Sequence, residues 1–279
     1  MPSNKIKIGK KYVGNGCDLY FIADIGANHD GDINRAFKLI ELAKESGADA
    51  AKFQNFQAKT IVSNKGFNDL GGKSSHQSSW KKSVYEIYED ASISYEWTSK
   101  IKEKCDEVGI EYCTSAYDFN SVDNVDPFLN VYKIGSGDIT WIEILDYIAS
   151  KNKPVILATG ASNMEDVNRA MSALLAKNSN IILMQCNTNY TASNENYKYI
   201  NLNVLKTYKQ KYPDIVLGLS DHTFGSSTVL GSIVYGARVF EKHFTDDNNR
   251  QGPDHKFAMN PKTLVHCPLM HPSAAACGG

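Results

Sequence analysis

Two histidines follow two neighbouring apolar segments of the chain, at the point where each segment ends. His222 comes after residues 215–219, and His243 comes after residues 238–241. Imidazoles on adjacent strands can bind one divalent metal ion together, and a site with only two histidines leaves positions for water and for substrate oxygens. Either histidine alone is equally consistent with a hydrogen-bonded core residue. The paired placement favours a metal site formed by both side chains.

Two lysines stand at the ends of other apolar segments. Lys52 closes one such segment and Lys133 lies in another, and a buried ammonium group without a counter-charge is too costly to keep. Each lysine must therefore reach solvent, pair with an internal carboxylate or meet a bound anion. Hydroxyl side chains and glycines at matching segment ends favour an anion site that takes a carboxylate and a phosphate: Thr114, Ser136, Ser220, Gly135 and Gly137.

Asp24 and Asp138 are the candidate acid–base groups. Each follows an apolar segment and stands in a turn that contains glycine. A carboxyl group in such a position can exchange a proton with a bound substrate. Aspartate is also common in turns for a structural reason, because its side chain accepts hydrogen bonds from the local backbone. The spacing leaves both interpretations open.

The elements that must position these side chains alternate along the chain. Eight short apolar, β-branched segments are expected strands: 19–24, 48–54, 110–114, 131–134, 155–158, 181–185, 215–219 and 238–241. Helical periodicity separates them, most clearly at 33–43, 141–150 and 162–177, and Asp32 is the expected N-cap of the first helix. This alternation predicts an α/β protein, specifically a (β/α)8 TIM barrel. An open Rossmann sheet is disfavoured because residues 26–31 lack the middle glycine of its phosphate-binding turn.

Three stretches depart from this rhythm. Residues 1–18 are an expected N-terminal extension before a barrel domain at 19–264, and residues 265–279 form an atypical tail. Pro268 and Pro272 exclude a regular helix there, so the eighth helix is expected to be missing or non-native. Residues 59–79 are an expected insertion after the second strand, at the functional end of the barrel.

The composition excludes several classes of function. The 30 basic and 31 acidic side chains give a formal net charge of −1, which argues against a dedicated nucleic-acid binder. No apolar run is long enough to cross a bilayer, and the polar N-terminus carries no secretory signal. The 6 cysteines form no CxxC pair, as is usual for reduced thiols in the cytoplasm. We therefore expect a cytoplasmic protein without nucleic-acid or membrane partners.

Six short motifs resemble those of the sialic acid synthase family, which includes N-acetylneuraminate, legionaminate and pseudaminate synthases. They are IADIGANHDG at 22–31, AKFQ at 51–54, YKIGSGD at 132–138, GLSDHT at 218–223, EKHFT at 241–245 and GPDH at 252–255. The resemblance implies a TIM barrel that condenses phosphoenolpyruvate with an open-chain N-acyl amino sugar, an N-acyl hexosamine. The products would be a nonulosonic acid and phosphate, for surface glycan biosynthesis.

The resemblance also implies roles for individual residues. His222 and His243 would hold Mn²⁺ or Mg²⁺, and Asp24 and Asp138 would be catalytic. Lys52, Thr114 and Lys133 would bind the phosphoenolpyruvate carboxylate, and the phosphate would contact Ser136, Ser220 and Thr188. Asp254 would bind the sugar. Gln54, in the AKFQ motif, and Tyr190, at the end of the sixth-strand stretch CNTNY at 186–190, complete the predicted substrate-binding set.

The chain departs from the family pattern at several points. Glu is usual where Asp24 and Asp138 stand, so each side chain is shorter by about 1.5 Å, and Ala158 replaces a usual serine. A small C-terminal domain that resembles an antifreeze protein is expected to be absent. A homodimer is expected only by analogy. Two alternatives therefore stay open: a truncated or catalytically impaired barrel that acts as a binding or assembly subunit, and a phosphoenolpyruvate condensation with a different aldose.

Overall fold

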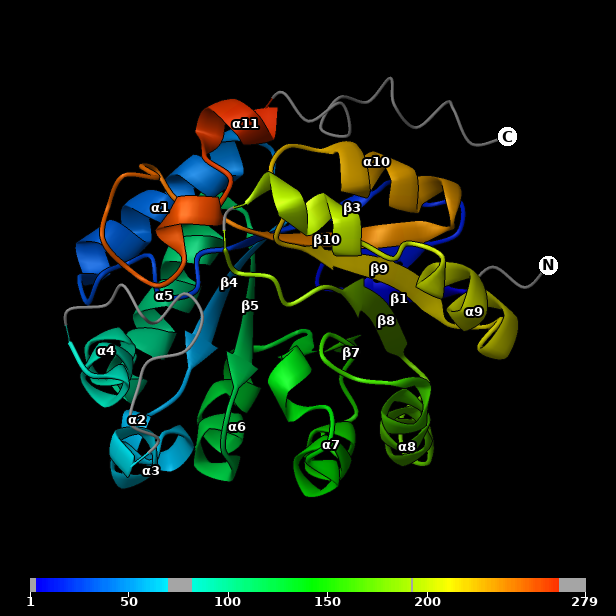
Figure 1. Ribbon diagram of the computed structural model, residues 1–279, viewed down its shortest axis with the longest axis horizontal. Helices are drawn as coiled ribbons and strands as arrows, with labels where there is room; N and C mark the ends of the chain where they lie inside the picture. The colour runs from blue at the N-terminus through cyan, green and yellow to red at the C-terminus, as the bar shows by residue number, and fades with distance from the viewer. Residues whose placement is uncertain (1–3, 70–81, 192, 266–279) are drawn as a thin grey trace.

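The structure is a computed structural model that describes residues 4–69, 82–191 and 193–265. Eight parallel strands close into a barrel in the order β10-β3-β4-β5-β6-β7-β8-β9 (Figure 1). They are β3 (Tyr20–Asp24), β4 (Ala50–Asn55), β5 (Glu111–Ala116), β6 (Tyr132–Ile134), β7 (Val155–Ala158), β8 (Ile181–Cys186), β9 (Val216–Asp221) and β10 (Ala237–His243). The predicted TIM barrel is confirmed, and all eight expected strands are present.

Helices surround this barrel and connect its strands. They are α1 (Ile33–Glu45), α5 (Tyr95–Val108), α6 (Phe119–Val125), α7 (Ile142–Ala149), α8 (Met164–Leu175), α9 (Val204–Lys211), α10 (Ser227–Val234) and α11 (Pro261–Val265). Short 3-10 turns occur at η2 (Asp126–Phe128), η3 (Ser136–Asp138), η4 (Asn194–Tyr199) and η5 (His255–Phe257). As predicted, the Asp32 side chain caps the first helix, accepting a hydrogen bond from the Asn34 amide at 2.8 Å.

Alternate residues of each strand face opposite sides of the barrel wall. Inward side chains such as Ile22, Cys113 and Val239 form one buried cluster, whereas Phe21, Tyr112 and Phe240 pack in a second cluster with the surrounding helices. This two-residue period decides which polar groups at the strand ends reach the interior.

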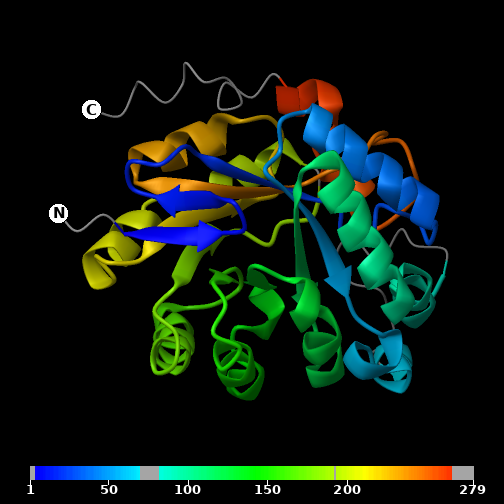
Figure 2. The same cartoon turned by 180° about the vertical axis from the view of Figure 1, so that it is seen from behind.

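An N-terminal hairpin, which the sequence analysis did not predict, covers the end of the barrel at which the parallel strands begin. It consists of β1 (Lys5–Ile8) and β2 (Lys11–Gly14), which pair antiparallel (Figure 2). Ile6, Ile8 and Val13 belong to the inward-facing cluster, together with residues at the first positions of β3 and β9. The hairpin therefore closes the bottom of the core, while the other end remains for function.

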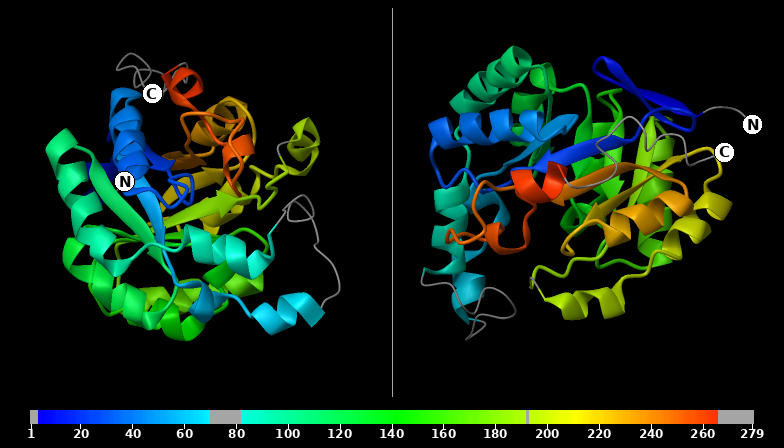
Figure 3. Two further views of the ribbon diagram at one scale, coloured as in Figure 1. Left: turned by 90° about the vertical axis from the view of Figure 1, so that its left-hand side faces the viewer. Right: turned by 90° about the horizontal axis from the view of Figure 1, so that it is seen from above.

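The insertion after β4 contains three short helices, α2 (Ala58–Ile61), α3 (Asn64–Asp69) and α4 (Val84–Ala91). Their cyan ribbons lie together on one side of the barrel (Figure 3). Ser83 and Glu86 form a capping box that fixes the start of α4. Part of the predicted insertion, residues 70–79, lies outside the described residues.

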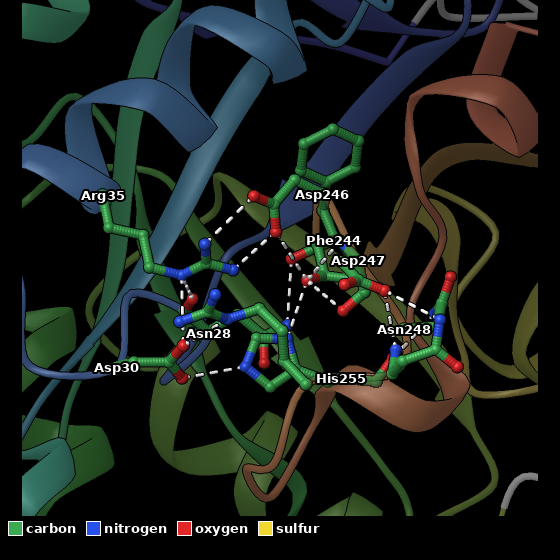
Figure 4. A network of polar contacts seen from close by, with 11 residues as sticks. Asn28, Asp30, Arg35, Phe244, Asp246, Asp247, Asn248 and His255 are labelled. Atoms are coloured by element: carbon green, nitrogen blue, oxygen red, sulfur yellow. Dashed lines mark hydrogen bonds and ion pairs between the residues drawn. The ribbon is translucent and has the colours of Figure 1, made fainter.

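The segment 244–260, between β10 and α11, is held against the β3–α1 loop by a polar network (Figure 4). His255, which is fully buried, hydrogen-bonds Thr245 Oγ1 at 2.7 Å through Nδ1 and Asp30 Oδ1 at 2.8 Å through Nε2. The Arg35 guanidinium bonds both carboxylate oxygens of Asp246. These contacts join residues that are far apart in sequence.

The eighth helix begins at Pro261, and α11 packs against α1. The remainder of the predicted atypical tail, residues 266–279, lies outside the described residues. No described helix is long and apolar enough to cross a membrane.

Replacing His255 by Ala should weaken the attachment of segment 244–260. The variant loses both ring hydrogen bonds and leaves a buried gap, so the free energy of unfolding should fall by about 2–4 kcal/mol. Urea unfolding measures this loss, and hydrogen exchange should accelerate at 247–258. Lys256→Ala, at the exposed neighbour, is the matched control. Equal stability of the two variants would show that the network does not hold the segment.

Candidate active site

The carboxyl ends of the barrel strands surround one deep cavity. Its lining includes most of the predicted site residues and several that were not predicted: Asp24, Lys52, Gln54, Ser115, Tyr117, Lys133, Gly135, Ser136, Ala158, Cys186, Tyr190, Ser220, His222, Glu241 and His243. Inward-facing positions of the barrel strands, and the loops that follow them, supply these groups. The closed sheet thus brings together residues from Asp24 to His243.

Lys52 and Asp24 form a buried ion pair at one side of this cavity. The Lys52 Nζ lies 2.7 Å from Asp24 Oδ2, and both side chains are almost completely buried. Burial raises the pKa of Asp24, although the Lys52 ammonium opposes this shift. Burial would lower the pKa of Lys52, but Asp24 and Glu241 outweigh it and raise that pKa. The second carboxyl oxygen of Asp24, Oδ1, is buried without a hydrogen-bond partner among the described residues.

Lys133 forms a second buried ion pair, with Glu241. Its Nζ lies 3.1 Å from Glu241 Oε1, which also accepts a hydrogen bond from Ser220 Oγ at 3.1 Å. Burial works to raise the pKa of Glu241, but the ammonium groups of Lys133 and Lys52 outweigh it and hold that pKa at about 2. Glu241 Oε2 has no hydrogen-bond partner among the described residues. The two lysines are thus compensated, and each pair keeps one unbonded carboxyl oxygen.

His222 and His243 lie next to each other at the same cavity, with ring centroids 5.3 Å apart. His222 Nδ1 is 2.8 Å from the backbone oxygen of Asn187. A carbonyl only accepts hydrogen bonds, so Nδ1 carries a proton, and the neutral ring offers the lone pair of Nε2. Burial works to lower the pKa of His222, but Cys186 and the Asn187 carbonyl outweigh it and raise that pKa. Burial lowers the pKa of His243 to about 4, with Asp254 opposing and His222 reinforcing this shift. His243 is therefore neutral at neutral pH, as a metal ligand must be.

The separation of the two imidazoles is compatible with one divalent ion between them. A metal about 2.1 Å from one nitrogen of each ring would hold the ring centres roughly 4.5–5.5 Å apart, and the observed separation agrees. Asp24 Oδ2 is 3.6 Å from His243 Nε2, and Asp254 Oδ2 is 3.7 Å from His243 Nδ1. No group of three His, Cys, Asp or Glu residues is already arranged as a ligand set within the described parts of the chain.

Two aromatic rings enclose the histidine pair. The ring centroid of Tyr190 lies 4.4 Å from that of His222, and the ring centroid of Phe257 lies 5.1 Å from that of His243. Phe257 was not predicted, and it belongs to η5 in the segment that His255 holds in place. The network of Figure 4 therefore also positions one wall of the site.

Two of the three residues predicted for the phosphate, Ser136 and Thr188, lie beside Gly160. Its amide donates to Ser136 Oγ at 2.9 Å, and a Cβ at this position would lie 2.5 Å from Thr188 Cγ2. Only glycine allows these side chains to approach so closely. Ser136 and Ser220 line the cavity itself, whereas Thr188 stands beside it.

Thr114 is not brought to the cavity. It lies on the outward face of β5, fully buried, and its Oγ1 donates to Asn55 Oδ1 at 2.7 Å. The next residue, Ser115, faces inward and lines the cavity. A one-residue difference in a strand reverses the side on which a side chain lies, which is why the strand end was assigned to the wrong residue.

Some residues of the cavity were assigned no role from the sequence, chiefly Glu241, Ser115, Tyr117 and Cys186. Glu241 could have been found, since it stands two positions before His243 on one strand and must face the same side. The opposite face of the same strands carries a further buried pair, Lys242 with Asp221, which lies among the helices.

The remaining predicted residues line a wider cleft at the mouth of the cavity. Asp254 and Tyr190 border one part of it, Asp138 borders another, and Gln54 is common to both. Burial raises the pKa of Asp138 to about 6, although the Lys133 ammonium acts in the opposite direction. The cavity and cleft together could bind a small, strongly anionic ligand beside a longer polar one.

Comparison with known proteins places this arrangement in a family. The model of the NeuB family matches residues 39–268. The N,N'-diacetyllegionaminic acid synthase of Campylobacter jejuni is 36% identical over 250 residues, which are 87% of this chain and 72% of that protein. The human N-acetylneuraminate-9-phosphate synthase is 31% identical over 257 residues, 91% of this chain and 70% of that protein.

A solved structure agrees with the sequence relatives. The N-acetylneuraminic acid synthetase of Leptospira borgpetersenii, in complex with citrate, superposes with a TM-score of 0.84 at 28% identity. The superposition covers 96% of this chain and 87% of that one. The match in sequence and in fold leads to one conclusion: the chain belongs to the NeuB family of sialic acid synthases.

Proposed function

We propose that this chain condenses phosphoenolpyruvate with an open-chain N-acyl amino sugar to give a nonulosonic acid and phosphate. The observation that carries this proposal is the single cavity that holds both lysine–carboxylate pairs beside the two histidines. Phosphoenolpyruvate carries a carboxylate and a phosphate close together, and both groups need cations to bind them. The family relatives named above are synthases of sialic-type acids.

In this proposal the lysines and hydroxyls bind the anionic substrate. Lys52 and Lys133 supply two ammonium groups, and Ser115, Ser136 and Ser220 supply hydroxyls from inward-facing positions. Both lysines are paired with carboxylates in the empty site, so neither ammonium group is buried without a counter-charge before the ligand binds. Charge-assisted hydrogen bonds to oxyanions are among the strongest available in a buried site.

His222 and His243 are the residues that would hold a divalent ion, Mn²⁺ or Mg²⁺. Such an ion supplies Lewis-acid polarisation of the sugar aldehyde when it is bound. The Asn187 carbonyl fixes the His222 ring so that Nε2 faces the site with its lone pair. Tyr190 and Phe257 shield the pair from water.

The protein must assist two proton transfers, one to the aldehyde oxygen and one from the attacking water. C3 of phosphoenolpyruvate bonds to the aldehyde carbon, whose oxygen gains a proton, and a water adds at C2 and loses one proton. The C2–O bond to phosphate then breaks as the new C2 hydroxyl becomes the keto group, and the remaining proton of that hydroxyl leaves with the phosphate. Asp24 presents the unbonded Oδ1 in the cavity, and Asp138 stands at its mouth. We assign the two transfers to these carboxyl groups. Glu241, whose pKa of about 2 keeps it ionised, orients Lys133.

The shorter side chain of Asp24 is compatible with an active site. Its Oδ2 still reaches Lys52 Nζ at 2.7 Å and lies 3.6 Å from His243 Nε2. This contact favours a working geometry over an impaired barrel.

Lys133→Met should weaken phosphoenolpyruvate binding selectively. We expect the KM for phosphoenolpyruvate to rise about tenfold to a hundredfold, the range of one hydrogen bond to a charged group, with a much smaller change in the KM for the sugar. Lys242→Met is the matched control, because Lys242 is equally buried in an ion pair but lies on the outer face. Steady-state phosphate release measures both constants. Equal changes in the two KM values would contradict the proposed anion site.

His222→Ala should abolish metal-dependent phosphate release and also metal binding. Titration of Mn²⁺ followed by electron paramagnetic resonance should show one tight site in the wild type and at least a hundredfold weaker binding in the variant. His29→Ala removes a histidine that lies outside the cavity lining and serves as control. Unchanged Mn²⁺ affinity in His222→Ala would remove the metal assignment.

Asp138→Asn should stabilise the protein at neutral pH while reducing turnover. The folded state raises the pKa of Asp138 to about 6. It therefore binds the proton more tightly than the unfolded chain, and the wild type loses stability as pH rises from about 4 to about 6. Asn removes this loss, so Tm should increase by roughly 2–4 °C at pH 7.5 and by little near pH 4.

Thermal unfolding at several pH values tests this expectation. Asp214→Asn, at an exposed aspartate, is the control for a charge change alone. A lower Tm of Asp138→Asn at pH 7.5, or a gain that does not depend on pH, would contradict the account of Asp138.

A further inference from the structure

The residues that precede the two histidines of the cavity form a buried ion pair on the other face of the same strands. Asp221 precedes His222 at the end of β9, and Lys242 precedes His243 in β10. The Lys242 Nζ lies 2.5 Å from Asp221 Oδ2, and both side chains are almost completely buried. Adjacent residues of a strand point to opposite faces, so this outward ion pair lies behind the inward histidine pair.

The backbone ladder between β9 and β10 ends at this ion pair. Lys242 and Asp221 are the last residues that face each other across the two strands, which are neighbours in the barrel (Figure 1). His243 is still paired with Asp24 of β3, whereas His222 begins the loop after β9. The ladder therefore holds His243 in register but stops one residue before His222.

The ammonium group of Lys242 connects the two strand ends beyond the ladder. Besides its contact with Asp221, it donates a hydrogen bond to the backbone oxygen of Thr223 at 2.6 Å. The Thr223 amide in turn donates to Asp221 Oδ1 at 3.1 Å. His222 thus stands between two residues that Lys242 bonds, and Lys242 is itself the chain neighbour of His243. One side chain links the backbone on both sides of one histidine to the residue beside the other.

Thr228, at the start of α10, completes this outward network. Its Oγ1 donates to Asp221 Oδ2 at 2.6 Å, and Thr223 Oγ1 donates to Asp221 Oδ1 at 2.9 Å. Both oxygens of the Asp221 carboxylate are therefore bonded. In the cavity, by contrast, Asp24 and Glu241 each keep one oxygen without a hydrogen-bond partner among the described residues. The outward network has no bonding capacity left for a ligand, which indicates that it positions residues and does not bind substrate.

We propose that Lys242 is a positioning residue, which sets the separation and orientation of His222 and His243 for a shared divalent ion. The inference rests on the proposed function for the ion, although the positioning itself can be measured without it. Groups that orient metal ligands from behind change the metal affinity by about tenfold to a hundredfold when they are replaced.

Lys242→Met should weaken Mn²⁺ binding by about tenfold to a hundredfold, measured by titration with electron paramagnetic resonance in the absence of substrates. Leu174→Ala is the matched control. Leu174 is fully buried on α8, which packs against α7, so this variant should lose thermal stability but bind Mn²⁺ as the wild type does. Equal Mn²⁺ affinity in Lys242→Met and the wild type would overturn the proposal, and so would an equal loss of affinity in the two variants.

Asp221→Asn is a milder variant that keeps the test decisive where Lys242→Met lowers stability too far. Lys242 can still bond the Thr223 carbonyl, so Mn²⁺ affinity should fall by about twofold to tenfold, the range of one hydrogen bond. At saturating Mn²⁺ both variants should keep the KM for phosphoenolpyruvate, because Lys52 and Lys133 retain their carboxylates. A KM that rises as much as the Mn²⁺ dissociation constant would show a general disturbance of the site and contradict the positioning role.

A measurement without metal separates this inference from the proposed function. The Nδ1 proton of His222 is bonded to the Asn187 carbonyl at 2.8 Å, and nuclear magnetic resonance can follow its exchange with water. We expect this exchange to be about tenfold faster in Lys242→Met, because the ring is less firmly held. Unaltered exchange would overturn the inference. Faster exchange, in a protein whose wild type binds no Mn²⁺ at His222, would refute the metal assignment and still support the positioning of the histidine by Lys242.

Discussion

The burial of two ammonium groups at one end of the barrel is the constraint on which the site depends. Neither Lys52 nor Lys133 could stay charged there alone, and Asp24 and Glu241 make their presence tolerable. The hydrogen bonding of these carboxyl groups is incomplete, because each keeps one oxygen without a hydrogen-bond partner among the described residues. The cavity therefore combines balanced charge with unused hydrogen-bonding capacity.

The closed sheet converts this constraint into a precise arrangement. Inward positions on the strands bring the lysines, carboxylates and histidines to one cavity. The Lys242–Asp221 ion pair lies on the outward face of the strands, where a similar lysine–carboxylate pair packs between the barrel and the helices. Beyond the strands, the loop after β10 needs separate support. His255 and Asp30 hold it in place (Figure 4). Phe257 and Asp254 of this loop thereby lie beside His243.

Much of the fold and part of the site could be predicted from the sequence. Period and composition identified all eight strands, and the predicted pair His222 and His243 lies together at the cavity where the strands end. Thr114 was misplaced because the alternation of a strand can be counted only from a residue whose side is known. Contacts such as Asp30 with His255, and the hairpin under the barrel, depend on pairs distant in sequence, which local patterns do not report.

We propose that two lysines and two histidines bind one anionic three-carbon substrate and one divalent ion in the same cavity. A crystal structure with phosphoenolpyruvate and Mn²⁺, with the metal located by anomalous scattering, tests it most directly. The account predicts a manganese peak bonded to both His222 and His243, and phosphoenolpyruvate oxygens bonded to Lys52 and Lys133. A manganese peak elsewhere, or a ligand that contacts neither lysine, would contradict it.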